Sequence, residues 1–313
     1  MDKINRDNIP EALYKCTSCP RNCKVDRSSD KLGYCKTGVK ISIGSICAHR
    51  GEEPVISGHH GICNIFFTHC NMQCIYCQNY DISRNTSPII EFQIELSELV
   101  DRVERILDQG CKSVGFVSPS HYYIQMLQII NELHRRGRRP IFVYNTNSYD
   151  RKEAIEALDG IIDVYLPDFK YADEKIGRNL SDAPHYPEIA SAAIGEMFRQ
   201  KGADIKLDED DLILSGLIVR HLVLPGYIEN SKAVLRHIAS NFSTDIYISL
   251  MSQYYPTPQV FTHPKLCNRL KPSEYDEVVA EFDRLGFHRG WVQQMESSDY
   301  YRPNFVRDHP FEK

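Results

Sequence analysis

The sequence predicts an α/β protein built around a parallel sheet that forms an open, partial (β/α)6 barrel. From Ile62 onward, short apolar strands alternate with helical patterns. Six such strand–helix units in series imply a parallel sheet with helices outside it. No seventh or eighth unit is found, which favours a partial barrel over a closed one. In barrels of this kind the chemistry gathers at the carboxyl ends of the strands.

The strands are short apolar runs, and the first of them enters a polar, cysteine-rich loop. The six predicted strands, in chain order, are Ile62–Phe67, Ser113–Ser118, Pro140–Tyr144, Ile162–Leu166, Leu217–Leu224 and Asp245–Leu250.

Apolar residues at helical spacing predict the helices between these strands. The spacing holds from Leu96 to Leu107, with Gly110 as a C-terminal cap, and again from Ile124 to Leu133, with a stop near Gly137. Further helices are expected at Arg151–Leu158, Ser231–Phe242 and Ser273–Leu285.

The segment Ala183–Ser215 interrupts this alternation. Ile189–Gly202 is expected to be helical, and the charged run Ala203–Leu214 to form a hairpin. We interpret the segment as an insertion at the barrel mouth that shapes partner access; the alternative is a solvated excursion with no role.

Composition limits the classes of protein and partner. Of the 313 residues, 42% are hydrophobic and 25% charged, as in ordinary globular proteins. A net charge of −5 predicts no nucleic-acid or anionic-membrane partner. No apolar run approaches a membrane span and the N-terminus lacks a signal-peptide core, so we expect a cytoplasmic protein. Its 11 cysteines then indicate metal or cluster ligation rather than disulfides.

Three cysteines after the first strand have the spacing Cys-x3-Cys-x2-Cys: Cys70, Cys74 and Cys77. A cubane 4Fe–4S cluster normally takes four cysteine ligands. Three thiolates therefore leave one iron open for a substrate or cofactor. The alternative, three buried packing cysteines, fits poorly with a polar loop.

A second cysteine group lies in residues 1–60, which have no helical period: Cys16, Cys19, Cys23 and Cys35. Four thiolates in one short segment can close a tetrahedral zinc site or hold an auxiliary 4Fe–4S cluster. The spacing does not decide between the two. We divide the chain into a cysteine-rich metal-binding segment, residues 1–60, and a partial barrel, residues 61–313.

The spacing around Cys70, with Tyr76 before the last cysteine, resembles the signature of the radical S-adenosylmethionine (SAM) superfamily. Asn145–Tyr149, Asp163–Lys170 and Leu217–Gly226 resemble segments of its pyruvate formate-lyase-activating enzymes. The resemblance covers roughly Gly61–Gln293, and it extends to uncharacterised homologues that carry a similar N-terminal cysteine segment. It implies that the open iron binds SAM and that an electron from the cluster cleaves it, giving a 5′-deoxyadenosyl radical.

The resemblance also implies roles for polar residues at the strand ends. Asn145 or Asn147 is expected to bind ribose hydroxyls, and Lys170 and Arg220 to pair with the SAM carboxylate. Asp168 would complement positive charge or orient Lys170. The alternative is that Asp168 and Lys170 form an exposed ion pair of little consequence.

Strand alternation directs only one of Arg220 and His221 inward, and the resemblance selects Arg220. Ser118 and Ser120 stand where most radical SAM enzymes have a Gly-Gly-Glu-like motif, and hydroxyls or backbone carbonyls there are expected to accept hydrogen bonds from the SAM amino group. Gln253, near the sixth strand, is expected to contact SAM or substrate. Tyr76 is counted with these cofactor-binding residues.

The function predicted from these features is reductive cleavage of SAM followed by hydrogen-atom abstraction. The resemblance suggests that the acceptor is a glycine of a glycyl radical enzyme, and that an electron donor such as flavodoxin or ferredoxin reduces the cluster. Two alternatives stay open: a radical SAM enzyme that modifies a small molecule or another peptide, and a non-catalytic metal-binding scaffold or sensor.

Overall fold

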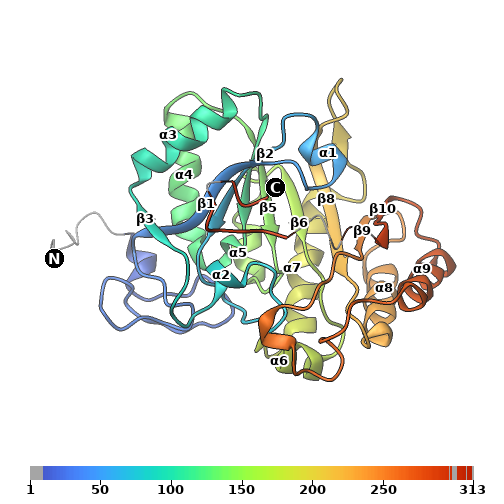
Figure 1. Cartoon of the computed structure of the whole chain (residues 1–313). Helices are drawn as coiled ribbons and strands as arrows, with labels where there is room; N and C mark the ends of the chain where they lie inside the picture. The colour runs from blue at the N-terminus through green and yellow to red at the C-terminus, as the bar shows by residue number, and fades with distance from the viewer. Residues whose placement is uncertain (1–9, 296, 298–301, 308, 312–313) are drawn as a thin grey trace.

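A mainly parallel sheet of ten strands forms the centre of the computed structural model, which describes residues 10–295, 297, 302–307 and 309–311 (Figure 1). Its strand order is β10-β9-β8-β6-β5-β4-β2-β1-β3, with β7 paired to β8. All neighbouring pairs from β2 to β10 along this path are parallel. The strands are β1 Ile41–His49, β2 Ile62–Phe67, β3 Phe92–Ile94, β4 Ser113–Val117, β5 Ile141–Thr146, β6 Val164–Pro167, β7 Lys206–Leu207, β8 Ile213–Leu222, β9 Tyr247–Met251 and β10 Gly290–Val292.

All six predicted strands are present, as β2, β4, β5, β6, β8 and β9. Every residue of β2, β4 and β6 is buried, which explains why these strands are readable as apolar runs. The sequence analysis missed β10, which follows α9 and pairs in parallel with β9. With only three residues it has too little pattern to be recognised.

Helices lie on the outside of the curved sheet, with α3 and α4 toward one edge and α8 and α9 toward the other (Figure 1). The predicted helices are confirmed with small shifts at their ends. The α-helices are α1 Pro54–Ser57, α2 Tyr80–Ser83, α3 Leu96–Leu107, α4 Tyr123–Arg135, α5 Lys152–Glu156, α6 Glu174–Ser181, α7 Tyr186–Lys201, α8 Ile228–Asn241 and α9 Pro272–Leu285.

The interpretation of Ala183–Ser215 as an insertion at the barrel mouth is wrong. Its helix, α7, connects β6 to β8 and packs against α5 and β8, so it is a crossover helix of the barrel. Ala193, Ile194 and Met197 are fully buried on its inner face. The predicted hairpin exists, but it pairs β7 with the first residues of β8, at the end of the sheet opposite the strands' carboxyl ends.

The sheet begins before the predicted boundary at residue 60. Strand β1 pairs antiparallel with β2 and with β3, so that Ile41–His49 is part of the same sheet as the barrel strands. A bulge between Ile43 and Ser45 interrupts its pairing with β2. Residues 10–40 contain a short 3-10 helix, Glu11–Leu13, and otherwise turns. In the described part of the chain, no helix has the length and apolarity needed to cross a membrane.

Candidate functional site

The carboxyl ends of the parallel strands surround a cavity of about 650 Å³. Its wall contains nearly all of the residues predicted to hold the first cluster and SAM, and they come from six different strands or the loops after them. These are Cys70, Cys74, Tyr76, Cys77, Ser118, Asn145, Asn147, Asp168, Lys170, Arg220 and Gln253. Ser120 is the exception: it is 1% exposed and its hydroxyl lies 3.4 Å from that of Thr146, beneath the cavity wall. Cavities of this size accommodate small molecules and cofactors.

The cysteine loop between β2 and α2 presents three half-buried sulfur atoms to this cavity. Each sulfur has a hydrogen-bond donor from the protein. The Asn147 amide lies 3.4 Å from Cys70 Sγ, the Ser181 hydroxyl 2.9 Å from Cys74 Sγ and the Ser83 hydroxyl 3.2 Å from Cys77 Sγ. Donors of this kind stabilise thiolates and orient metal ligands.

Burial raises the pKa of Cys74 to about 11 and raises those of Cys70 and Cys77 as well. The three thiols are therefore protonated until a metal binds, and metal binding must release their protons. The donor set fits a 4Fe–4S cluster, which Cys70, Cys74 and Cys77 would hold through three thiolates and whose fourth iron would have no cysteine ligand.

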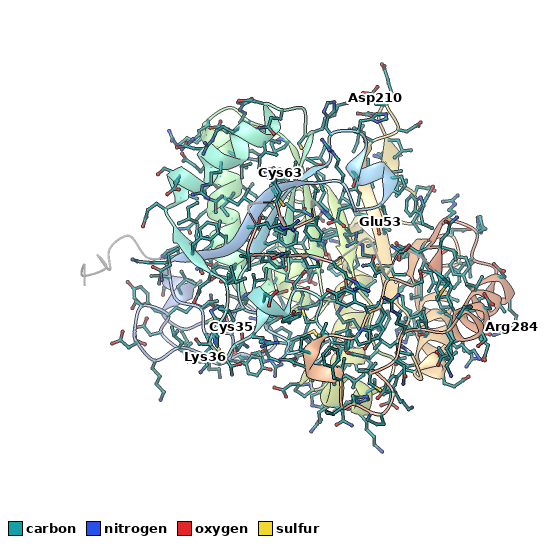
Figure 2. The ribbon with its side chains drawn as sticks, viewed as in Figure 1. Cys35, Lys36, Glu53, Cys63, Asp210 and Arg284 are labelled. Atoms are coloured by element: carbon teal, nitrogen blue, oxygen red, sulfur yellow. The ribbon has the colours of Figure 1, made fainter. Side chains whose placement is uncertain are left out.

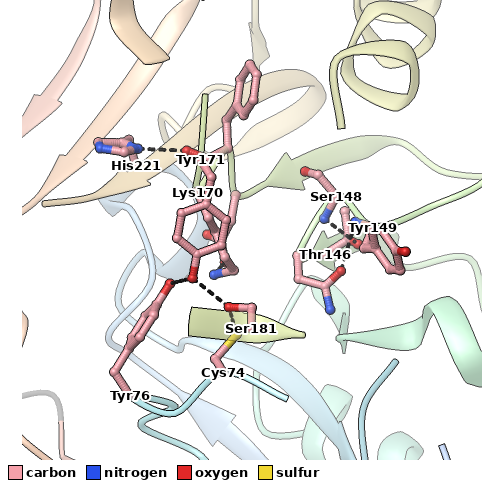
Figure 3. Close-up of polar contacts among 12 residues, drawn as sticks. Cys74, Tyr76, Thr146, Ser148, Tyr149, Lys170, Tyr171, Ser181 and His221 are labelled. Atoms are coloured by element: carbon pink, nitrogen blue, oxygen red, sulfur yellow. Dashed lines mark hydrogen bonds and ion pairs between the residues drawn. The ribbon is translucent and has the colours of Figure 1, made fainter. Parts of the chain in front are cut away.

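A chain of hydroxyl groups supports Cys74 from behind (Figure 3). The Tyr76 hydroxyl hydrogen-bonds to that of Tyr171, which hydrogen-bonds to Ser181, and Ser181 donates to Cys74 Sγ. Tyr76 is 4% exposed and also reaches the cavity wall. Its hydroxyl is thus used inside the protein, so Tyr76 can offer a ligand its ring.

Lys170 is the cation that faces the cysteine loop. Its ammonium group lies 2.6 Å from Asp168 Oδ2, and the two side chains are 16% and 22% exposed. Burial alone would lower the pKa of Lys170, but the negative charge of Asp168 raises it above its ordinary value. The pair is therefore a charged, half-buried element of the cavity wall rather than an exposed ion pair.

Arg220 also lines the cavity, but its guanidinium is already engaged by two carboxylates. Its Nε and Nη2 donate to Glu53 at 2.8 and 2.6 Å, and Nη2 also donates to Glu52. Asn64 donates a 2.8 Å hydrogen bond to Glu52, so Arg220, Glu52, Glu53 and Asn64 form one ion cluster. Burial alone would raise the pKa of Glu52, but Arg220 brings it down to about 2. His221 lies on the other face of β8, as strand alternation predicts, and bonds to Phe169 O.

The sequence analysis missed Glu52 and Glu53. Figure 2 shows Glu53 beside β8, although it lies 167 residues before Arg220 in the chain. The one available signal was a pair of acidic residues directly before Pro54, which also fits an ordinary helix start. Because Arg220 carries two partners, Lys170 is the better placed of the two cations to meet an incoming carboxylate.

Asn147 acts mainly within the protein. Besides Cys70 Sγ, its side-chain amide donates to Asn71 Oδ1 at 2.9 Å, and its Oδ1 accepts a hydrogen bond from the Tyr149 N–H. Asn145 lines the cavity and is the better placed carboxamide for a ribose hydroxyl. Ser118 has a left-handed backbone, with φ of 52°, where β4 turns into the cavity wall.

The C-terminal segment, of which the structure describes residues 302–307 and 309–311, lines one side of the cavity through Pro303 and Phe311. In Figure 1 it runs in front of the central strands. Phe311 lines the cavity, with its ring 4.1 Å from that of His49, and Phe305 packs edge-on against Phe66. Gln253 accepts a hydrogen bond from Gln293 at 3.0 Å, so this predicted contact residue also joins the barrel to the segment after β10.

The four N-terminal cysteines form a second group, outside the cavity. Cys16, Cys19 and Cys35 are buried and Cys23 is half-buried. Burial, together with the charges of the other three cysteines, raises the pKa of Cys19 to about 12. Across the described residues, no three His, Cys, Asp or Glu side chains converge as a single metal ion would require.

Comparison with known proteins identifies the central part of the chain. Residues 64–204 match the family model described as the radical SAM superfamily. An uncharacterized protein of Methanocaldococcus jannaschii is 29% identical over 280 residues, covering 87% of this chain and 75% of that protein. Among solved structures, methylornithine synthase is 15% identical, with a TM-score of 0.47. The matched region covers 71% of this chain and 61% of the synthase chain. A domain of a pyruvate-formate lyase-activating enzyme from Bacteroides vulgatus is also 15% identical, with a TM-score of 0.39. The matched region covers 55% of this chain and 93% of that domain.

Proposed function

We propose that this chain, whose residues 64–204 match the radical SAM superfamily model, is a radical SAM enzyme that abstracts a hydrogen atom from a glycine of a glycyl radical enzyme. The family implies a 4Fe–4S cluster and SAM as cofactors. When bound, the reduced cluster would supply the electron that cleaves a carbon–sulfur bond of SAM, and the cleaved SAM would supply the radical that removes the hydrogen atom.

The observation that carries the proposal is the meeting of Cys70, Cys74 and Cys77 with Lys170 in one cavity. The three thiolates would hold the cluster, and each is oriented by a hydrogen-bond donor from the protein. Lys170 would pair with the carboxylate of SAM, while Asp168 holds its ammonium group in place. Asn145 would orient the ribose.

The choice of a glycine as acceptor is supported by chemistry and by the motifs at the strand ends. The Cα–H bond of a peptide glycine is weak because the resulting radical delocalises onto the flanking amides. The Asp168-x-Lys170 pair, which resembles the activating enzymes, lies in the cavity wall. A flavodoxin or ferredoxin is the class of one-electron donor that we propose for reducing the cluster.

The test is anaerobic reconstitution with iron and sulfide, reduction with dithionite, and assay for 5′-deoxyadenosine. We expect the wild-type protein to produce it, and alanine at Cys70, Cys74 or Cys77 to abolish it. Cys267→Ala is the matched control, because Cys267 lies outside the cavity. Deoxyadenosine from a variant that lacks all three cysteines would overturn the assignment.

The acceptor is tested with a candidate glycyl radical enzyme deuterated at its glycines. We expect deuterium in the deoxyadenosine and the electron paramagnetic resonance doublet of a glycyl radical. Deoxyadenosine that stays free of deuterium with every such partner would overturn the acceptor while leaving SAM cleavage in place. Deuterium transfer from a small molecule or another peptide would have the same effect.

A further inference from the structure

The four N-terminal cysteines, left open by the sequence between zinc and a second cluster, are brought together by the fold of residues 10–40. Cys16 and Cys35 are 19 positions apart in the chain, yet one side chain, Arg27, contacts both. Its Nε lies 3.1 Å from Cys16 Sγ and its Nη2 3.9 Å from Cys35 Sγ. A Cβ added to Gly33 would come within 2.7 Å of Cys23 Sγ, so the turn before Cys35 lies directly against Cys23.

The position of the Arg27 guanidinium indicates that the four N-terminal cysteines carry negative charge. Arg27 is 3% exposed, and within the described residues its side-chain hydrogen-bond partners are two cysteine sulfurs and one backbone carbonyl, with no carboxylate among them. Its Nη1 donates to the carbonyl oxygen of His121, at 2.6 Å. A buried guanidinium beside neutral thiols would be an uncompensated charge, which proteins rarely tolerate. Thiolates that bind a metal would supply the missing anions.

The geometry separates a cluster from zinc. At a zinc ion four sulfur atoms converge on one point, each at about 2.3 Å. In the described part of the chain no such convergence occurs, either here or at Cys70, Cys74 and Cys77. The latter three belong to a family whose cluster spreads its thiolates over separate irons. Within the described residues, the N-terminal group therefore lacks the convergence that a zinc site requires, as do the three cysteines of the first loop.

We infer that Cys16, Cys19, Cys23 and Cys35 bind a second iron–sulfur cluster, with Arg27 as its buried counter-charge. All four positions of this cluster have a cysteine ligand, so it has no open iron of its own. It would lie beside the first cysteine loop, because Arg21, two residues after Cys19, donates from Nε to Asn71 O at 2.8 Å.

The test uses the full-length chain with Cys70, Cys74 and Cys77 all replaced by alanine, reconstituted anaerobically. We expect about four irons and about four acid-labile sulfides per chain, against about eight of each in the wild type. Adding Cys19→Ala should remove the remaining iron, whereas adding Cys111→Ala, a buried cysteine outside both groups, should not. Zinc without sulfide, or no metal in a variant whose circular dichroism shows it folded, would overturn the inference.

If the triple variant fails to fold, the iron content of the wild type tests the inference. Two clusters give about eight irons per chain, whereas one cluster gives about four. Arg27 is tested by the reduction potential of the second cluster. Arg27→Gln removes a buried positive charge, so adding an electron becomes harder and the potential should become more negative. Arg27→Lys should restore it toward the wild-type value. An unchanged potential in Arg27→Gln would refute the role of Arg27 as counter-charge.

Discussion

At the scale of single residues, the site depends on which charges are already paired. Lys170 and Arg220 look equivalent in the sequence, since each follows a strand and each can pair with a carboxylate. The structure separates them: Lys170 has one partner, Asp168, at the edge of the cavity, whereas Arg220 is held by Glu52 and Glu53. Their replacement should therefore affect different measurements.

Lys170→Ala should weaken SAM binding while the cluster stays in place, because the ammonium group of Lys170 donates to Asp168 and not to a cysteine of the cluster site. Loss of one charge-assisted hydrogen bond costs about 1.5–3 kcal/mol, or roughly 10- to 150-fold in affinity. Isothermal titration calorimetry of the reconstituted protein with SAM measures this affinity. The exposed Lys175→Ala is the control. Unchanged affinity in Lys170→Ala would show the Asp168–Lys170 pair to be structural.

Arg220→Gln should mainly lower the free energy of unfolding, by about 3–5 kcal/mol at neutral pH, because it leaves two buried carboxylates without a counter-charge. Denaturant titration measures this. Arg289→Gln, which breaks an exposed ion pair with Asp204, should cost less than about 1 kcal/mol.

The same variant has a pH signature. In the wild type Arg220 holds the pKa of Glu52 at about 2, below the roughly 4.3 of an unfolded chain, so Glu52 stabilises the fold above about pH 4 and loses this contribution toward pH 2. Without Arg220 that contribution is gone, and protonation instead relieves the buried carboxylate. The stability difference between the two proteins should shrink as the pH falls from 7 toward 4. A difference that does not change with pH would argue against the ion cluster.

At the scale of elements, the close contact between strands β2 and β4 positions the ion cluster around Arg220. Gly115 in β4 pairs in register with Asn64 in β2, and a Cβ at Gly115 would lie 2.0 Å from Asn64 Oδ1. Asn64 in turn donates to Glu52. A glycine is thus required in β4 so that a side chain of β2 can reach the carboxylates that hold Arg220.

Gly115→Ala should destabilise the protein by about 1–3 kcal/mol, because Asn64 must move and leave Glu52 short of a donor. Gly195→Ala in α7 is the matched control: its new Cβ would meet Phe242 at 3.4 Å, an ordinary contact, and alanine favours a helix by up to about 1 kcal/mol. Thermal unfolding followed by circular dichroism compares them. Equal effects in both variants would show that the contact with Asn64 is not tight.

At the scale of the whole molecule, segments from both ends of the chain complete the barrel. Strand β1 extends the sheet on one edge (Figure 1). The C-terminal segment lines the cavity through Phe311, whose ring packs against His49, while Phe305 packs against Phe66. The partial barrel is therefore closed off in part by segments outside the strand–helix repeat.

Phe311→Ala should loosen this cover and speed SAM dissociation. The lost aromatic contact is worth about 0.5–1.5 kcal/mol, which corresponds to a roughly 2- to 10-fold weaker affinity. Stopped-flow displacement of SAM measures the rate. Phe261→Ala is the control, since Phe261 is 63% exposed. An unchanged dissociation rate in Phe311→Ala would mean that the C-terminal segment does not retain the ligand.

The sequence by itself determined the α/β class, the six parallel strands and the cysteine loop. Strands such as Ile62–Phe67 are buried on both faces, so their apolar runs stand out in the chain, and ligand spacing such as Cys70-x3-Cys74-x2-Cys77 is local. Because the carboxyl ends of parallel strands meet at one edge, the common location of most candidate site residues was also predictable.

Only the tertiary structure decided which of those residues are free to act. Arg220 meets Glu52 and Glu53 across more than 160 positions of sequence, and no local pattern encodes a pairing at that distance. The same holds for Arg27, whose guanidinium reaches the carbonyl oxygen of His121, 94 positions away, and for α7, whose small and apolar residues pack as a crossover helix. Local spacing specifies elements and ligand sets, whereas the partner of a buried charge depends on where the fold brings distant segments together.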